Sequence, residues 1–248
     1  MKSIGIIGSN LVGLLCADIL SSNNQITIID SELELGFPAS FPGTSNDLDI
    51  LENILQNQDQ HNLFKLIKNN TINFRTEWLC KLITHKIAKN GVIVYNRTRV
   101  IESKENEENI VIYTSGSDIN PHKLQFDIVI DLSEYSLVSL GDLKHENYQS
   151  SSKLIKPKLP VKDFFVGICL IRDLPELKEY HLALERQDDL VEVWYVEGNE
   201  QFPNNGWIES KNVSAYYDNK LMVLDDYYDK AVELCLLYTS PSPRDRVL

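Results

Sequence analysis

The stretch "SIGIIGSNLVGLLCADIL", residues 3–20, carries the strongest structural signal in the chain. Its first residues form a short apolar run that ends at Gly8, which is typical of a parallel strand buried on both faces. Apolar residues then recur at helical spacing as far as Leu20, so the pattern predicts a buried helix. The polar residues 21–24 end this helix, and "QITIID" at 25–30 predicts a second strand. The order strand, glycine turn, helix and strand predicts a βαβ unit.

The turn between the first strand and the helix follows the dinucleotide-binding pattern G-x-G-x-x-G with one departure. In that pattern the first glycine permits a sharp turn, the second lets the backbone approach a pyrophosphate, and the third lets the helix pack on the strand. Gly8 and Gly13 hold the first and third positions, whereas Asn10 holds the second. Asparagine tolerates positive φ better than other side chains, so we expect the turn to keep its shape. We also expect the Asn10 side chain either to crowd the phosphates or to hydrogen-bond to them.

Asp30 closes the second strand, seventeen residues after Gly13. A carboxylate at this place can accept hydrogen bonds from ribose hydroxyls, and it disfavours a 2′-phosphate. The sequence therefore predicts an α/β fold with a Rossmann-like FAD/NAD(P)-binding domain. One alternative stays open, in which the βαβ unit keeps its glycines for packing and has lost the ligand.

Composition places the chain among globular proteins. It has 248 residues, of which 43% are hydrophobic, enough for one large domain or two modest ones. The formal net charge of -12 argues against a nucleic-acid partner. No apolar run approaches the roughly 18 residues of a membrane span, and the N-terminus enters a strand without a leader-like segment. These features predict a cytoplasmic protein with no transmembrane segment. The four cysteines are scattered without metal-ligand spacing, so no metal site is predicted.

Helical and strand patterns continue along the chain. Helices are predicted within 47–68 and over "TEWLCKLITHKIAKNG" at 76–91. Three strand-like runs follow them, at 92–100, 109–115 and 126–132. A polar stretch with prolines at 145–160 predicts a crossover between domains, and the β-rich alternation beyond it predicts an antiparallel sheet. The predicted organisation is a dinucleotide-binding domain at 1–150, a partial antiparallel β substrate domain at 151–234 and a tail at 235–248.

The last residues differ in character from the rest of the chain. The string "CLLYTSPSPRD", residues 235–245, resembles the translation of a transposase sequencing adapter in one reading frame. Segments of that kind are left out of fold reasoning. The resemblance predicts that 235–248 is a non-native tail and that the natural protein continues beyond Leu234. A natural tail rich in serine and proline is the alternative.

Three stretches together resemble a known family. They are "GIIGSNLVGLLCADIL…ITIIDSE", "FRTEWLCKLITHKIAKNGVIVYNRTRV" and "FDIVIDLSEYS". Their order is similar to that of FAD-dependent oxidoreductases of the geranylgeranyl reductase and aromatic hydroxylase type, which share a glutathione-reductase-like FAD domain. The third stretch lacks the alanine and glycine that this family usually has after the strand. The family's later Gly-Asp segment, which binds the ribityl chain and the pyrophosphate, has no counterpart, since "LGDLKH" at 140–145 comes too early.

The resemblance implies a cofactor and a set of residues that bind it. FAD is the implied cofactor, NAD(P)H is a candidate electron donor, and a small organic molecule, isoprenoid or aromatic, is the implied substrate. The implied residues are Gly8, Ser9, Asn10 and Gly13 at the pyrophosphate, Asp30 at the adenosine ribose, Arg75 near the phosphates, Val100 at the adenine and Asp131 after the third strand. From the residues alone, Arg75 fits a surface residue beside a helix start equally well, and Val100 fits an ordinary strand residue.

Three functions remain open at this stage. The first is an FAD-dependent oxidoreductase that moves hydride between the flavin and an organic substrate. The others are an NAD-binding Rossmann dehydrogenase and a non-catalytic, flavoprotein-like binding protein. No motif of a serine hydrolase, zinc protease or P-loop enzyme occurs. Because a flavin carries the redox chemistry itself, no catalytic residue is assigned. The aromatic stretch at 194–210 either lines a substrate pocket or packs within the predicted sheet.

Overall fold

A computed structural model describes residues 1–55, 64–67, 71–116, 119–133 and 153–239. By contacts, these residues divide into two compact units that interleave along the chain. The first unit comprises 1–39, 80–158 and 228–248, and the second comprises 40–79 and 159–227. The domain borders at 150 and 234 stay a prediction. None of the described helices has both the length and the apolar character that crossing a bilayer requires.

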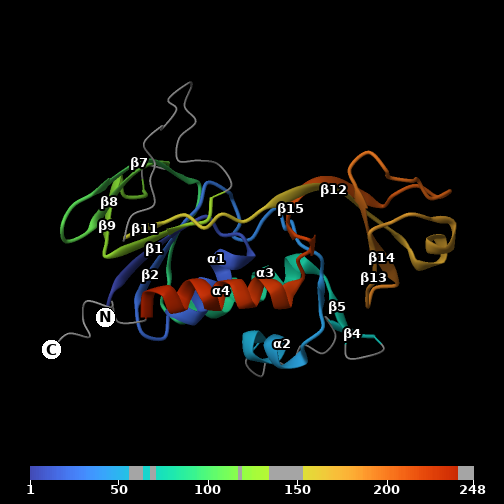
Figure 1. Ribbon diagram of the computed structural model, residues 1–248, viewed down its shortest axis with the longest axis horizontal. Coiled ribbons are helices and arrows are strands. Elements are labelled where there is room, and N and C mark those ends of the chain that lie inside the picture. Colours follow the sequence, from blue (N-terminus) through green and yellow to red (C-terminus); the bar gives the residue numbers. More distant parts are fainter. Residues whose placement is uncertain (56–63, 68–70, 117–118, 134–152, 240–248) are drawn as a thin grey trace. The chain divides into compact units, whose positions relative to one another are not determined.

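A five-stranded parallel sheet forms the centre of the first unit (Figure 1). Its strand order is β11-β10-β1-β2-β6, and every neighbouring pair is parallel. The bounds are β1 (Ser3–Ile7), β2 (Gln25–Ile29), β6 (Ile93–Tyr95), β10 (Ile128–Asp131) and β11 (Leu154–Ile155). Helix α1 (Leu11–Leu20) links β1 to β2 and is buried along most of its length. The predicted βαβ unit is therefore confirmed.

An antiparallel sheet of three strands belongs to the same unit. It consists of β7 (Thr98–Glu105), β8 (Ile110–Gly116) and β9 (Lys123–Phe126). Val100, Ile112 and Phe126 of this sheet share one buried cluster with Ile7 and Ile29 of the parallel sheet. Burial of such side chains is the main contribution to stability in a fold of this size.

Helix α3 (Thr76–Lys89) matches the helix predicted over 76–91. The helical spacing predicts an apolar stripe of Trp78, Leu79, Leu82, Ile83 and Ile87. Leu79, Ile83 and Ile87 are buried as predicted, whereas Trp78 is 47% exposed. Beyond its last turn, Gly91 adopts φ +83°, the left-handed conformation that commonly ends a helix.

Two stretches differ from the sequence-based expectation. The helix predicted within 47–68 covers only α2 (Leu48–Leu55), while β4 (Phe64–Leu66) is a strand. Phe64 pairs with Phe74 of the next strand, β5 (Ile72–Phe74), so pairing between strands decides the conformation. The predicted crossover at 145–160 also contains structure, because β11 adds a parallel strand beside β10. Residues 56–63 and 145–152 lie outside the described residues.

The second unit contains the predicted antiparallel sheet, in the order β13-β14-β12-β15-β16. Its strands are β12 (Val161–Leu170), β13 (Leu182–Glu185), β14 (Leu190–Val196), β15 (Glu209–Asp218) and β16 (Lys220–Leu221), and the short helix η3 (Ile171–Glu176) follows β12. Side chains alternate between the two faces. Phe164, Val166 and Trp194 share one apolar cluster, and Phe165, Cys169 and Tyr195 share the other. A small sheet of β3 (Thr44–Ser45), β5 and β4 belongs to this unit too.

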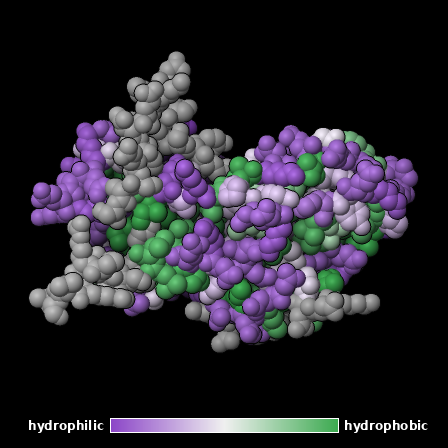
Figure 2. Space-filling model, viewed as in Figure 1, coloured by the Kyte–Doolittle hydropathy of each residue, from purple (hydrophilic) through white to green (hydrophobic). Residues whose placement is uncertain are grey.

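Helix α4 (Leu224–Thr239) follows β16 along the chain. Figure 2 shows hydrophobic residues gathered over part of this helix. Leu236 and Leu237, near its end, are 57% and 63% exposed. Both leucines lie in the segment 235–248 that the sequence predicts to be non-native.

Candidate functional site

Two glycines set the geometry of the turn between β1 and α1. Gly8 adopts φ +90°, and a Cβ atom there would lie 2.9 Å from the Leu132 carbonyl carbon. A Cβ atom on Gly13 would lie 2.4 Å from the Gly8 carbonyl oxygen. Both positions therefore require glycine, the first for its backbone conformation and the second for close helix–strand packing. Backbone geometry and packing account for both glycines.

Asn10 adopts a different conformation from the one that we expected. Its φ is −57°, so the tolerance of asparagine for positive φ is not used, and Gly8 alone makes the left-handed turn. The Asn10 side chain is the N-cap of α1, because its Oδ1 accepts a hydrogen bond from the Gly13 N–H at 3.1 Å. Its Nδ2 donates to the Leu132 carbonyl at 3.1 Å. The side chain thus ties the helix start to the backbone that follows β10.

Asp30 lies directly against the turn, as its position at the end of β2 predicts. The Ser9 N–H donates to its Oδ2 at 2.5 Å, and the Glu32 N–H donates to its Oδ1 at 2.8 Å. The Asp30 side chain is buried, as is Ser9, whose Oγ accepts from the Gly36 N–H at 3.0 Å. A buried carboxylate that accepts backbone N–H groups is held in one orientation. The β1–α1 turn and the acidic residue therefore form one rigid group of contacts.

Asp131 occupies the end of β10, the neighbour of β1 in the parallel sheet. Its carboxylate accepts from the Ser133 N–H at 2.9 Å and forms an ion pair with Lys156 Nζ at 3.1 Å. Only 1% of the residue is exposed, so its charge depends on these partners. The carboxyl ends of adjacent parallel strands meet at one edge of a sheet, which is where open α/β folds bind ligands. Asp30 and Asp131 both lie at that edge.

Val100 and Arg75 make other contacts. Val100 belongs to β7, and its side chain packs into the buried cluster that includes Ile7 and Ile29. Only its backbone could meet a ligand. Arg75 belongs to the second unit, where its Nε forms an ion pair with Glu77 at 3.3 Å and its side chain is 44% exposed. The roles that the resemblance implies for these two residues stay predictions.

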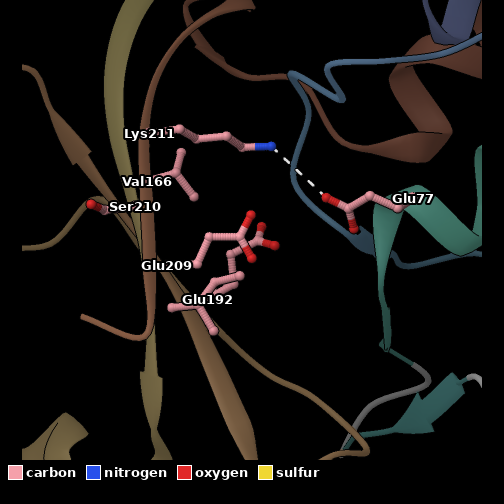
Figure 3. Close-up of a pocket in the computed structure, with 7 residues that line it drawn as sticks. Glu77, Val166, Glu192, Glu209, Ser210 and Lys211 are labelled. Carbon is pink, nitrogen blue, oxygen red and sulfur yellow. Dashed lines mark ion pairs between the residues drawn. The ribbon is translucent and has the colours of Figure 1, made fainter. Parts of the chain in front are cut away.

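The second unit contains a small polar cavity on one face of the antiparallel sheet (Figure 3). Its volume is about 10 Å³, enough for one water molecule. The cavity is lined by Glu77, Val166, Ile168, Glu192, Glu209, Ser210 and Lys211. Cross-strand pairing brings these residues together, because Ile168 of β12 pairs with both Glu192 of β14 and Glu209 of β15.

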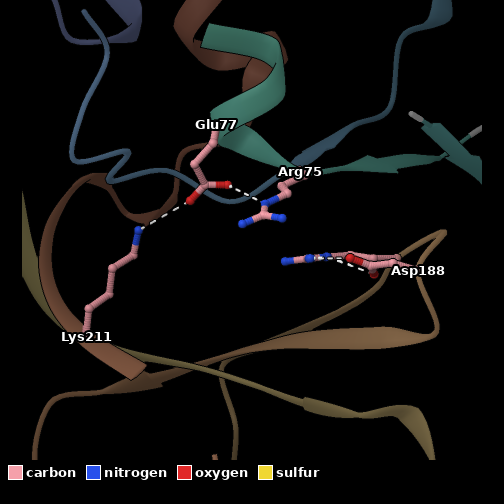
Figure 4. Close-up of polar contacts among 5 residues, drawn as sticks. Arg75, Glu77, Asp188 and Lys211 are labelled. Carbon is pink, nitrogen blue, oxygen red and sulfur yellow. Dashed lines mark hydrogen bonds and ion pairs between the residues drawn. The ribbon is translucent and has the colours of Figure 1, made fainter. Parts of the chain in front are cut away.

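Glu192 is the most buried acid of this cavity. Burial raises the pKa of its carboxyl, and the negative charge of Glu77 raises it further, whereas a hydrogen bond from Trp194 lowers it. Lys211 forms an ion pair with Glu77 at 3.9 Å, so Glu77 lies between Lys211 and Arg75 (Figure 4). Sequence patterns did not predict the cavity residues around Glu192. The signal was a glutamate in the middle of the apolar run "LVEVWYV", where a charged side chain needs a specific partner.

The aromatic side chains of the stretch at 194–210 do not line this cavity, although its last two residues, Glu209 and Ser210, do. Trp194 and Tyr195 lie in the cores on opposite faces of the sheet, and Phe202 is 72% exposed. Trp207 packs on Gly167, where a Cβ atom would lie 2.4 Å from the indole ring. Within the described parts of the chain, no group of three or more metal-ligating side chains could hold a metal ion.

No protein-family model matches the sequence, and no curated protein matches it. Solved structures do match. The p-nitrophenol 4-monooxygenase PnpA from Pseudomonas putida DLL-E4 is 10% identical with a TM-score of 0.60, over 98% of this chain and 82% of that chain. The Diels-Alderase PyrE3 of pyrroindomycin biosynthesis is 10% identical with a TM-score of 0.58, over 98% of this chain and 68% of that chain. The flavin-dependent halogenase CmlS is 15% identical with a TM-score of 0.52, over 87% of this chain and 50% of that chain.

These matches establish the fold class. The parallel βαβ sheet combined with antiparallel sheets is the fold of flavin-dependent monooxygenases, over part of the length of those proteins. The predicted α/β fold is therefore confirmed, and the resemblance to enzymes of the aromatic hydroxylase type is confirmed at the level of the fold. Sequence identities of 10% to 15% say nothing about the reaction or the substrate.

Proposed function

We propose that this chain is part of an FAD-dependent oxidoreductase that acts on a small organic molecule. The observation that carries the proposal is the 2.5 Å hydrogen bond between the Ser9 N–H and the Asp30 carboxylate. It holds an acidic residue at the end of β2 beside the start of α1, in a fold shared with flavin-dependent enzymes. This is the arrangement in which a carboxylate can bind ribose and a helix start can bind a diphosphate.

The residues of the turn suit the adenosine diphosphate half of FAD. A carboxylate offers about four lone-pair sites, and the two backbone hydrogen bonds of Asp30 use one on each oxygen, which leaves acceptor sites for ribose hydroxyls. The amides of Leu11 and Val12 begin α1, where no earlier helical carbonyl can accept their hydrogen bonds. The Gly8 position has no side chain to obstruct a ligand. These residues fit the cofactor, and Asn10 is the exception.

Each residue has a distinct part in this proposal. Asp30 would orient the adenosine ribose and, by its charge, select against a 2′-phosphate. The α1 start would offset the charge of the diphosphate through its N–H groups and its dipole. Asp131, held by Lys156, would keep the neighbouring strand end in place. A bound flavin would supply the hydride transfer itself.

One related structure is named for p-nitrophenol, an aromatic compound, and this name supports an aromatic substrate. The resemblance found in the sequence supports an isoprenoid substrate equally and NAD(P)H as the electron donor. We also propose a cytoplasmic location.

Absorbance spectroscopy and calorimetry on the purified chain test the proposal. We expect FAD and ADP to bind and NADH to bind less well, because the fold is shared with flavin-dependent enzymes. The acidic ribose site by itself suits the adenosine of either dinucleotide. We also expect FAD to bind weakly, without the yellow colour of a tightly held flavin, because the chain spans only 50% to 82% of the related structures named above. Binding of NADH in preference to FAD would instead support a Rossmann dehydrogenase.

A second candidate function is a binding protein that has lost redox activity. One observation favours it, namely the Asn10 side chain that caps α1 where a glycine usually leaves space for phosphate. In that case the chain would bind neither FAD nor NADH, and the glycines would serve packing alone. The same calorimetric experiment separates this function from the first.

A further inference from the structure

Asn10 is held at both ends of its carboxamide. Oδ1 accepts from the Gly13 N–H at 3.1 Å, and Nδ2 donates to the Leu132 carbonyl at 3.1 Å. The Asn10 carbonyl oxygen also accepts the Leu14 N–H at 3.0 Å. Residue 10 is therefore the point at which the helix start, the turn and the backbone after β10 are joined.

The Gly13 N–H, which donates to the Asn10 side chain, is a donor of the kind that an anion at a helix start would accept. The first N–H groups of a helix have no acceptor within the helix, and they point toward whatever lies before its start. A phosphate oxygen and an asparagine Oδ1 are both acceptors suited to such an N–H. The Oδ1 of Asn10 thus makes, from within the chain, a contact of the kind that a diphosphate oxygen would make.

Two further donors at or beside the turn are engaged within the chain. The Ser9 N–H is donated to Asp30, and the Gly36 N–H is donated to Ser9 Oγ. A ligand arriving at this turn finds its donors partly engaged, and it has to displace the cap in order to reach the Gly13 amide. A glycine at position 10 would remove both the acceptor and the Cβ atom.

Resting on the proposed function, we infer that Asn10 is a specificity-determining residue that competes with the cofactor's diphosphate for the start of α1. The cap and the ligand exclude each other, so the dinucleotide binds weakly and exchanges readily. The chemistry recognised is that of an adenosine diphosphate moiety, whether free or within FAD. Asn10 acts on binding only and has no part in the redox step.

Three substitutions of Asn10 distinguish its effect on helix stability from its effect on ligand binding. Asn10→Gly removes the carboxamide and the Cβ atom, and Asn10→Ala removes the carboxamide with both of its hydrogen bonds but keeps the Cβ atom. Asn10→Asp keeps a capping oxygen and replaces the Nδ2 donor with a negatively charged oxygen. Affinity for ADP and for FAD is measured by calorimetry on the full chain, and the melting temperature of each variant is measured without ligand.

We expect stability and affinity to change in opposite directions. The glycine and alanine variants should melt at lower temperature than the wild type and yet bind ADP about fivefold more tightly, the equivalent of one N-cap hydrogen bond. The aspartate variant keeps a capping oxygen but loses the donor to the Leu132 carbonyl, and its negative charge should make it bind ADP more weakly than the wild type. A purely structural cap would give weaker binding wherever the helix is destabilised.

The outcomes distinguish this inference from the proposed function. If the wild type binds ADP and the glycine variant binds it no more tightly, the inference is wrong and the proposed function stands. If neither the wild type nor any variant binds ADP or FAD, the proposed function is wrong and the inference falls with it. Unchanged helical circular dichroism in all variants confirms that each one is folded.

Discussion

The indole N–H of Trp194 donates to the carboxyl group of Glu192 across 2.6 Å, inside the antiparallel sheet of the second unit. The two residues are two positions apart in β14 and so lie on the same face of the sheet. Only 6% of Glu192 and 1% of Trp194 are exposed. The bond provides a polar partner for an acid that burial would otherwise strongly destabilise.

The raised pKa of Glu192 predicts a specific pH dependence of stability. A group whose folded-state pKa is raised binds more protons when folded than when unfolded, so stability falls as pH rises from the ordinary value of 4.5 through the folded pKa. Glu192→Gln cannot ionise, yet it keeps an acceptor for Trp194. Urea unfolding at several pH values should show that the free energy of unfolding falls less with rising pH in this variant than in the wild type. An identical decline in the variant would assign the pH dependence to other groups.

The Gly8 backbone predicts a graded effect of alanine substitution. Gly8 and Gly91 both adopt positive φ, but only Gly8 has backbone atoms within 3 Å of a potential Cβ atom. We expect Gly91→Ala to cost about 1 kcal/mol from backbone strain alone. Gly8→Ala should cost about 3 kcal/mol, because steric overlap adds to that strain. Chemical denaturation of both variants measures the difference, and equal costs would show that the overlap relaxes freely.

Tyr195 carries a hydroxyl group that is buried without a hydrogen-bond partner among the described residues. An unsatisfied buried hydroxyl costs free energy, so Tyr195→Phe should stabilise the protein by about 1 kcal/mol. Burial also raises the pKa of Tyr195 to about 12. Ultraviolet titration of the folded protein should therefore lose its latest tyrosine transition in this variant. Destabilisation by the substitution would indicate an ordered water on the hydroxyl.

Asp30 and Asp127 provide a matched pair for testing the binding site. Both accept backbone N–H groups next to β1, Asp30 from Ser9 after the strand and Asp127 from Ser3 at its beginning. Asp30→Asn should weaken ADP binding about tenfold through the loss of a charged acceptor. Asp127→Asn makes the same chemical change at the other end of the strand and should leave ADP binding unchanged. Calorimetry measures the ADP affinity of both variants. An equal loss of affinity in both would show that the substitutions act by disturbing the parallel sheet.

Local sequence patterns predicted most of the first unit. The apolar run before Gly8, the helical spacing after it and the position of Asp30 determined the βαβ unit, because each signal lies within a few residues of the structure that it encodes. The strand at Phe64–Leu66 escaped prediction, since its conformation depends on pairing with β5. Local propensity does not encode such a partner.

The sequence predicted only those parts of the candidate site that local patterns determine. The contact between Ser9 and Asp30 follows from the βαβ geometry, whereas the conformation of Asn10 does not follow from its identity. Asparagine is compatible with a left-handed turn and also with an N-cap, and the residues around it select the cap. The Glu192 cavity arises from the register of three strands, which the sequence pattern leaves undetermined.

The parallel sheet of the first unit ends in two very short strands, β11 with two residues and β6 with three. A long outer strand with unpaired amides and carbonyls can recruit a strand from another molecule and start aggregation. Here the outermost positions present too few such groups in a row to template that growth. The brevity of β6 and β11 thus limits how far a strand of another molecule could pair along either edge of this hydrophobic sheet.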